Sequence, residues 1–136
     1  MDKAELQLPE GKLLKAIIGP HAGFAYSGPT AAWAYKNIDP EKYKWVFLLG
    51  PAHHTFTDGC ALSQQEVFDT PLGPINIDWE ITEELKKKWG FSYYTKEDDE
   101  AEHSLELHSP FIKKIFGDHE FKLIPIVVGS VSYKKE

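Results

Sequence analysis

Two segments of this chain end in the same way, with an unbroken apolar run followed by Gly-Pro and then histidine. Residues 16–21 read Ala-Ile-Ile-Gly-Pro-His, and residues 46–54 read Val-Phe-Leu-Leu-Gly-Pro-Ala-His-His. A short apolar run without alternation is typical of a strand buried on both faces, and Gly-Pro ends a strand and turns the chain. The pattern therefore predicts two parallel strands of an α/β sheet, each with a histidine just past its carboxyl end.

These histidines are expected to form a site, because open α/β sheets bind ligands at the carboxyl edge of their strands. Imidazoles serve there as metal ligands or as acids and bases. Of the adjacent pair His53 and His54, we expect His53 to face the sheet edge, because it is nearer the strand end. We predict that the imidazoles of His21 and His53 lie within ~5 Å of a common point, as metal–nitrogen bonds of ~2.0–2.1 Å would permit.

Length and composition limit the class of protein. The 136 residues suit one domain, and a hydrophobic content of 42% is enough to build a core. The net charge of -6 argues against nucleic acid or membrane headgroups as partners. No apolar run approaches the ~20 residues of a spanning helix, and the first residues lack a secretory pattern. Because Cys60 is the single cysteine, no internal disulfide forms, and we predict a cytoplasmic protein.

The rest of the pattern predicts one α/β domain over residues 13–136, preceded by a loose arm over residues 1–12. Strands are predicted at 14–19, 44–50, 59–63, 66–70, 91–95 and 121–128, and helices at 28–35, 79–89 and 101–116. Pro110 would restart the last helix, with Ser109 as its N-cap. A strand–helix–strand succession favours a right-handed crossover and parallel strands. We therefore expect a mostly parallel sheet flanked by helices.

An acidic stretch leads into a third group of histidines, over residues 97–108. On a helix, His103 and Glu106 would share one face, and a histidine beside carboxylates is oriented and made more basic. The carboxylates can equally form a solvated segment that favours the start of a helix through its dipole. If a third metal ligand comes from this stretch, the candidates are Glu102, His103, Glu106 and His108.

Three sequence blocks, taken in order, resemble the MEMO-like family of mediators of receptor-driven cell motility, which are relatives of the class III extradiol dioxygenases. The blocks are residues 16–28, 49–54 and 100–108, and residues 123–129 resemble the strand that follows. The resemblance covers the N-terminal half of the family's domain, so the domain over 13–136 is incomplete relative to the family. It implies an α/β fold like the N-terminal half of the MEMO/extradiol dioxygenase fold.

Carried over residue by residue, the resemblance implies that His21 and His53 are metal ligands. The family's further ligands would lie outside this region. We therefore expect a site that holds Fe(II) or Cu weakly, or that holds no metal. Four polar side chains are expected to bind a ligand or to support the metal ligands: His54, His103, Glu106 and Tyr26.

Two functions of different classes follow from the resemblance. The first is a signalling or cell-motility protein that binds a ligand in a two-histidine crevice, with a phosphotyrosine peptide or a small aromatic molecule as partner. The alternative is a non-haem metal-dependent oxidoreductase of extradiol type, in which two histidines and a carboxylate hold Fe(II). The third ligand discriminates between them. Because the region resembles part of a fold, we also expect an exposed sheet edge and self-association.

Overall fold

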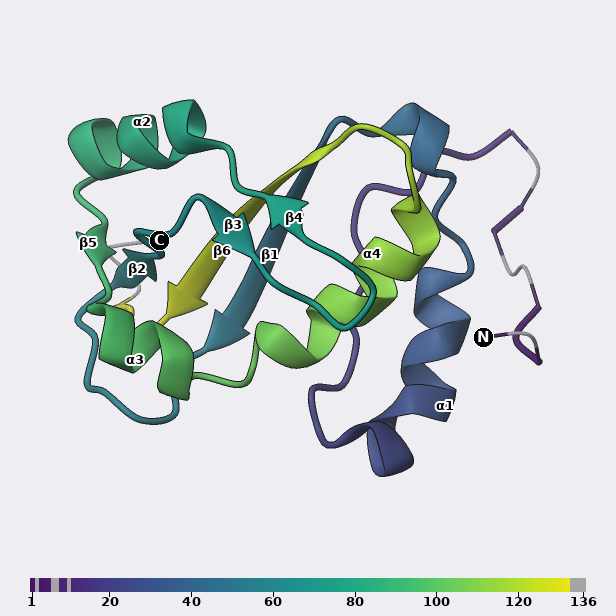
Figure 1. Ribbon diagram of the computed structural model, residues 1–136, viewed down its shortest axis with the longest axis horizontal. Coiled ribbons are helices and arrows are strands. Elements are labelled where there is room, and N and C mark those ends of the chain that lie inside the picture. The colour runs from purple at the N-terminus through teal and green to yellow at the C-terminus, as the bar shows by residue number, and fades with distance from the viewer. Residues whose placement is uncertain (2, 6–7, 10, 133–136) are drawn as a thin grey trace.

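The computed structural model describes residues 1, 3–5, 8–9 and 11–132, and it shows a four-stranded sheet with helices on both sides (Figure 1). In spatial order, the strands are β1 (Trp45–Pro51), β6 (Lys122–Val128), β2 (Cys60–Leu62) and β5 (Ser92–Tyr93). The pairs β1–β6 and β2–β5 are parallel, and β6–β2 is antiparallel. The prediction of a mostly parallel sheet flanked by helices is confirmed.

Several helices and a short hairpin accompany this sheet. The helices are α1 (Phe24–Tyr35), η1 (Pro40–Lys42), α2 (Trp79–Trp89), α3 (Lys96–Ala101), η2 (Glu106–His108) and α4 (Ser109–Phe116), and the hairpin pairs β3 (Val67–Phe68) with β4 (Ile75–Asn76). None of the helices in the described ranges is long and apolar enough to cross a membrane. The division into an arm and a domain stays a prediction, and residues 2, 6, 7, 10 and 133–136 lie outside the described part.

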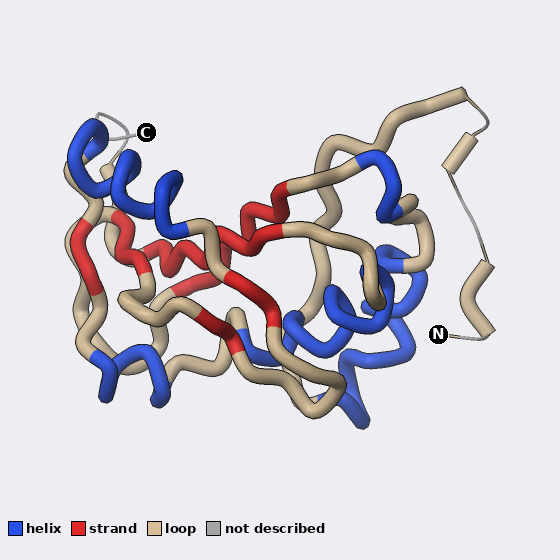
Figure 2. Tube along the Cα trace, turned by 45° about the horizontal axis from the view of Figure 1, so that its top comes forward, coloured by secondary structure: helices blue, strands red, loops and turns tan. Residues whose placement is uncertain are grey.

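Strand β6 forms the centre of the core because both of its faces are covered. Leu123 and Val127 pack with side chains of α1 and α4 in one apolar cluster. Ile124 and Ile126, on the opposite face, pack in a second cluster that includes Ile81 of α2. Figure 2 shows α2 on one side of the strands and α1 and α4 on the other. The sheet is therefore the middle layer of three.

Helix α2 has the bounds that the sequence predicts, because its end signals are strong. Asp78 is the N-cap, and its Oδ1 accepts a hydrogen bond from the Ile81 backbone N at 3.1 Å. Gly90 ends the helix in the left-handed conformation with φ of 71°. The same Asp78 carboxylate accepts a hydrogen bond from the Trp45 indole at 3.0 Å, which ties α2 to the start of β1.

The predicted strand over residues 14–19 is wrong. This segment runs between β1 and α1, on the side of β1 away from β6 (Figure 1). In the described part of the chain, no backbone hydrogen bond joins it to β1. A hydrogen bond from the Tyr43 hydroxyl to the Leu14 carbonyl, at 2.6 Å, holds it in place. Because the segment has no hydrogen-bonded neighbour among the described strands, it is not a strand despite its apolar sequence.

Two helix boundaries also differ from the prediction. Helix α1 begins at Phe24 rather than Gly28, so that Pro29 lies inside it. The predicted helical stretch over 101–116 is interrupted earlier than at Pro110, because the chain is extended at Glu102 between α3 and the later turns, and the expected restart is α4. Ser109 is the first residue of α4 and not its cap, and its hydroxyl donates a hydrogen bond to the Glu106 carbonyl at 2.8 Å.

Candidate metal centre

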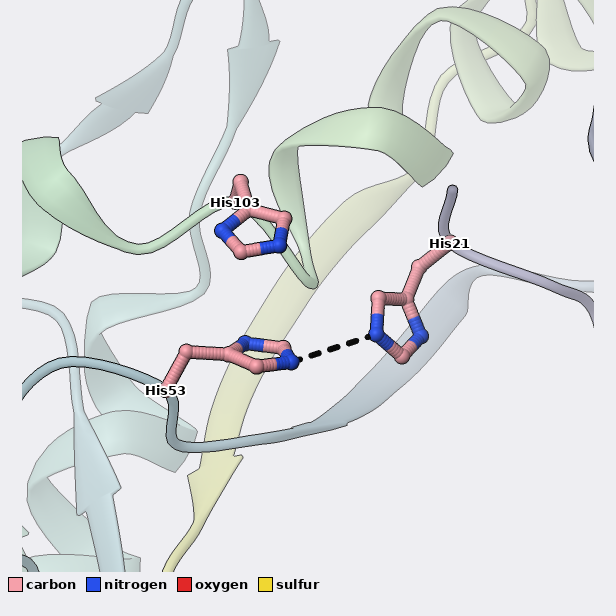
Figure 3. Close-up of side chains that lie close together, drawn as sticks. All are labelled: His21, His53 and His103. Atoms are coloured by element: carbon pink, nitrogen blue, oxygen red, sulfur yellow. Dashed lines mark hydrogen bonds between the residues drawn. The ribbon is translucent and has the colours of Figure 1, made fainter. Parts of the chain in front are cut away.

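Three histidines from separate parts of the chain converge at the carboxyl end of β1 (Figure 3). His21 follows the extended segment 14–19, His53 follows β1, and His103 lies between α3 and η2. Each offers one ring nitrogen, and these three atoms all lie within 4.8 Å of one another. The predicted convergence of His21 and His53 is confirmed, although the segment before His21 is not a strand. His103 is the third member, which the sequence left among four candidates.

The spacing of the nitrogens suits a single metal ion. The Nε2 atoms of His21 and His53 lie 3.3 Å apart. Two nitrogens bound to one tetrahedral ion at ~2.0–2.1 Å would lie roughly 3.3–3.4 Å apart. The rings of His53 and His103 are stacked with centroids 4.3 Å apart, and a ring nitrogen of His103 lies within 4.8 Å of those of His21 and His53. Without a metal, the two Nε2 atoms can share one proton in a hydrogen bond.

A buried carboxylate orients His53. Glu102 is 5% exposed, and its Oε1 lies 2.7 Å from His53 Nδ1 while its Oε2 accepts a hydrogen bond from the His53 backbone N at 2.7 Å. A proton held on Nδ1 by this carboxylate leaves the lone pair of Nε2 free to bind a metal ion, and this atom faces His21. Glu102 is therefore a support of the site and not a free metal ligand.

The electrostatic state of Glu102 follows from its partners. Burial by itself would raise the pKa of this carboxyl group. Hydrogen bonds from His53 and from the backbone N atoms of His53 and Ser104 oppose burial and lower the pKa to about 2. The backbone N of His103 also donates to Oε1, at 2.9 Å. The group is thus an anion at neutral pH, held by four donors around one site.

A close contact at Gly50 brings Glu102 to this position. A Cβ atom at Gly50 would lie 2.7 Å from Ser104 Oγ and 2.8 Å from Leu105 Cδ2. Without a side chain there, the segment after Glu102 packs directly on β1, and the Ser104 hydroxyl donates to the Pro51 carbonyl at 2.9 Å. The glycine of the second Gly-Pro thus has a packing role beyond ending the strand.

His108, one of the candidates for the third ligand, has a structural role. Its Nδ1 lies 2.8 Å from the Tyr35 hydroxyl, and the residue is buried. Burial, with a smaller contribution from His21, lowers the pKa of His108, so its imidazole is neutral. A Cβ atom at Gly19 would lie 2.9 Å from its Cε1, so His108 packs against the Gly-Pro turn that leads to His21.

The other predicted site residues surround the three histidines or lie apart from them. The His54 ring centroid is 5.8 Å from that of His103, next to the group but outside it. Tyr26 is 85% exposed on α1. Glu106 is exposed and lines a separate polar hollow of about 380 Å³ with Glu102. The predicted ligand-binding roles of these residues stay predictions.

The acidic run before His103 serves mainly to build α3. Thr95 caps this helix, accepting a hydrogen bond from the Asp98 backbone N at 3.1 Å. The carboxylate of Asp98 accepts hydrogen bonds from the hydroxyls of Thr55 and Thr95, and that of Asp99 accepts one from Ser63. These contacts fit the prediction of acidic residues at a helix start. Glu102 is the member of the run that reaches the site, where it is buried and holds His53.

The architecture defines a class: an α/β protein with a histidine-lined site at the carboxyl edge of its sheet. A model of a family described as "Memo-like protein" matches residues 2–136. Two relatives named "Protein MEMO1", from Danio rerio and Mus musculus, are each 44% identical over 124 residues. These cover 90% of this chain and 42% of the relatives. The "Protein memo-1 homolog" of Caenorhabditis elegans is 40% identical over 117 residues, covering 86% of the chain and 33% of that protein.

The chain belongs to the Memo-like family, as the resemblance of its sequence blocks predicts. It spans about two-fifths of the length of the MEMO1 relatives that it matches. The three sequence blocks that carry the resemblance supply the three histidines of the site.

Proposed function

We propose that His21, His53 and His103 bind one transition-metal ion and that the protein binds a ligand in the crevice beside it. The observation that carries this proposal is the convergence of three ring nitrogens within 4.8 Å, with two Nε2 atoms 3.3 Å apart. Neutral imidazoles suit Fe(II), Cu and Zn. Three protein ligands leave further coordination positions open, as in sites that act on or hold a second molecule.

The proposed setting is that of a Memo-like signalling or cell-motility protein in the cytoplasm. A bound cation would attract an anionic or electron-rich group, so the proposed ligand is a phosphotyrosine peptide or a small aromatic molecule. Phosphate oxygens or a phenolic oxygen could take an open coordination position. Tyr26 and His54, both exposed, are the proposed neighbours of such a ligand.

A metal-dependent oxidoreductase is the second candidate, and the open three-nitrogen site favours it. A bound Fe(II) would supply the redox chemistry, while the protein would hold the ion and exclude other ligands. Against the extradiol type stands the role of Glu102. The two-histidine-one-carboxylate pattern needs a carboxylate on the metal, whereas this carboxylate holds the Nδ1 and backbone N of His53. Binding is therefore the favoured function.

The test is metal titration of the purified chain by calorimetry with Fe(II), Cu(II) and Zn(II). We expect binding to disappear in the double variant His21→Ala/His53→Ala and to weaken about 10–100-fold in Glu102→Gln, the usual effect of losing a supporting partner. His103→Ala should weaken binding if His103 is the third ligand. His119→Ala, in the turn after α4, is the matched control and should bind normally.

Two further measurements separate the candidate functions. The metal-loaded chain should bind a phosphotyrosine peptide more tightly than the same peptide with tyrosine. Oxygen consumption with a catechol would instead favour the oxidoreductase. Unaltered metal affinity in the double variant would rule out the three-histidine site, provided that its far-ultraviolet circular dichroism matches that of the parent. We expect the variant to unfold at a lower temperature, because replacing His53 removes one of the four donors that hold the buried Glu102 carboxylate.

A further inference from the structure

An apolar groove of about 500 Å³ runs along the outer edge of β1, and it forms no part of the histidine site. We call it the edge groove. Five consecutive β1 residues, Trp45–Leu49, line one wall, and Leu14–Ile17 with Gly19 line the other. Consecutive residues of a strand point to alternating faces, so a groove that touches all five lies along the edge of the strand. Side chains of α1 and α4 form its floor, including Tyr35, Ile112 and Phe116.

On the β1 wall of the groove, backbone groups have no hydrogen-bond partner among the described residues. The Lys44 carbonyl accepts from the Lys122 N at 2.9 Å, and the Ala52 N donates to the Val128 carbonyl at 3.0 Å. In a strand, the N–H and C=O of one residue point to the same edge and alternate along the chain. The even-numbered residues therefore face β6, and Trp45, Phe47 and Leu49 direct their backbone groups into the edge groove. Pro51, which has no N–H, is also at an outward position, as prolines in sheets usually are.

The opposite wall, formed by residues of the segment 14–19, is also able to pair with a strand. Residues 14–19 are extended and apolar, the pattern that predicts a strand, yet among the described residues they have no strand partner. Ile18 is 96% exposed. This segment and β1 both run toward the histidine site, since His21 and His53 follow their carboxyl ends and lie 3.3 Å apart. A strand inserted between them can pair with both walls in one orientation.

We infer that the edge groove receives one β-strand, and that this strand comes from the part of a Memo-like polypeptide outside the region shared with this chain. The MEMO1 relatives are 44% identical, yet this chain covers 42% of their length. The inserted strand would be apolar on both faces: one side would contact Ile112 and Phe116, and the other would lie beside Phe47 and Leu49, which are 52% and 59% exposed. Such a strand reads as a continuous apolar run.

A second copy of this chain is a poorer occupant. In the described part, the strands other than β1 and β6 span two or three residues each. β6 is paired in the centre of the sheet, and β1 is walled by residues 14–19 in every copy. A second copy therefore offers no free described strand that could pair along five residues of β1.

The experiment uses this chain and, as a separate polypeptide, the residues of the Danio rerio relative that lie outside the 124 matched ones. The two are co-expressed, and amide hydrogen exchange is measured on the chain alone and on the complex. We expect a one-to-one complex by light scattering. Exchange of the Phe47 and Leu49 amides should slow, because they gain carbonyl partners, while the amides of α2 should change little.

Two variants at one position separate backbone pairing from side-chain contact. Phe47→Pro removes an outward N–H and leaves the ladder to β6 intact, whereas Phe47→Ala keeps the N–H. Both should fold, as far-ultraviolet circular dichroism can check. Proline should weaken the complex about tenfold more than alanine, the effect of one lost backbone hydrogen bond.

Three results would overturn the inference. The first is the absence of a complex between the folded chain and the second polypeptide. The second is equal affinity of Phe47→Pro and Phe47→Ala. The third is strong protection of the Phe47 and Leu49 amides in a dimer of this chain alone, which would make a second copy the occupant. None of these results depends on a metal, so the inference and the proposed metal site can fail separately.

Discussion

Strands β1 and β6 lie side by side with seven residues each and equally apolar sequences, yet they are covered differently. Every residue of β6 from Leu123 to Val127 is buried. By contrast, Trp45, Phe47 and Leu49 of β1 are each more than half exposed. β6 has helices on both faces and partners on both edges, whereas β1 has one open edge. The burial of a strand thus depends on its neighbours, which its own apolar pattern does not reveal.

β1 itself differs between its carboxyl end and its outer edge. At the end, Glu102 and Ser104 satisfy the polar groups around His53 and Pro51. Along the edge, backbone groups face an apolar groove. The polar groups at the end of the strand are therefore hydrogen-bonded within this chain, whereas those along its edge are available to a strand from another polypeptide. Three predictions test these contrasts.

The largest expected effect comes from truncating the buried strand. Leu123→Ala should lower the free energy of unfolding by about 2–5 kcal/mol, because Leu123 is 0% exposed and its removal leaves a cavity. Leu49→Ala, the same change on the neighbouring strand, should cost less than about 0.5 kcal/mol. Urea unfolding of both variants measures the difference. Equal losses would mean that β1 is as well covered in solution as β6.

The second prediction concerns the carboxyl end of β1. Gly50→Ala should destabilise the fold by about 1–3 kcal/mol through overpacking against Ser104 and Leu105. It should also weaken metal binding, because Glu102 moves with that segment. Gly28→Ala is the matched control: its Cβ would meet Phe111 at an ordinary 3.9 Å, and alanine favours the helix by about 0.5–1 kcal/mol. The same sign for both changes would contradict the close contact at Gly50.

The smallest effect on stability is expected at the edge. Phe47→Lys should change the free energy of unfolding by less than about 0.5 kcal/mol and should reduce association of the chain with the second polypeptide, because a charged side chain on an edge strand resists strand pairing. Light scattering over a range of concentrations measures this. Trp89→Lys, at a 68% exposed position on α2, should leave association unchanged. Equal reductions in both variants would show that association depends on net charge and not on the edge.

The sequence predicted best those elements whose first and last residues are marked by local capping signals. Helix α2 has an amphipathic pattern, Asp78 at its start and Gly90 at its end, and its prediction holds at both ends. Helix α1 has Gly23 as an N-cap without a side chain to mark it, so Pro29 was the stronger signal and misplaced the start. The strand over 14–19 failed for another reason, because a strand needs a neighbour that the described chain does not provide.

The candidate site was predictable in part. The equivalent positions of His21 and His53 after two apolar runs predicted that they lie together. The prediction is confirmed because both runs point toward the same site, although one of them is not a strand. The identity of the third histidine depended on a helix that does not continue through residues 102–103. The role of Glu102 could not be predicted from a run of five carboxylates, since it follows from long-range hydrogen bonds with His53 and from the packing of Ser104 and Leu105 on Gly50.

The pairing of β1 with β6 has a consequence for the order of folding. β1 ends at Pro51, and β6 begins at Lys122, near the end of the described chain. Contacts between residues so distant in sequence form slowly, because a long loop must close first. During synthesis from the amino end, the apolar side chains of β1 would leave the ribosome well before their partner strand. This interval is when the nascent chain is most exposed to aggregation and to capture by chaperones.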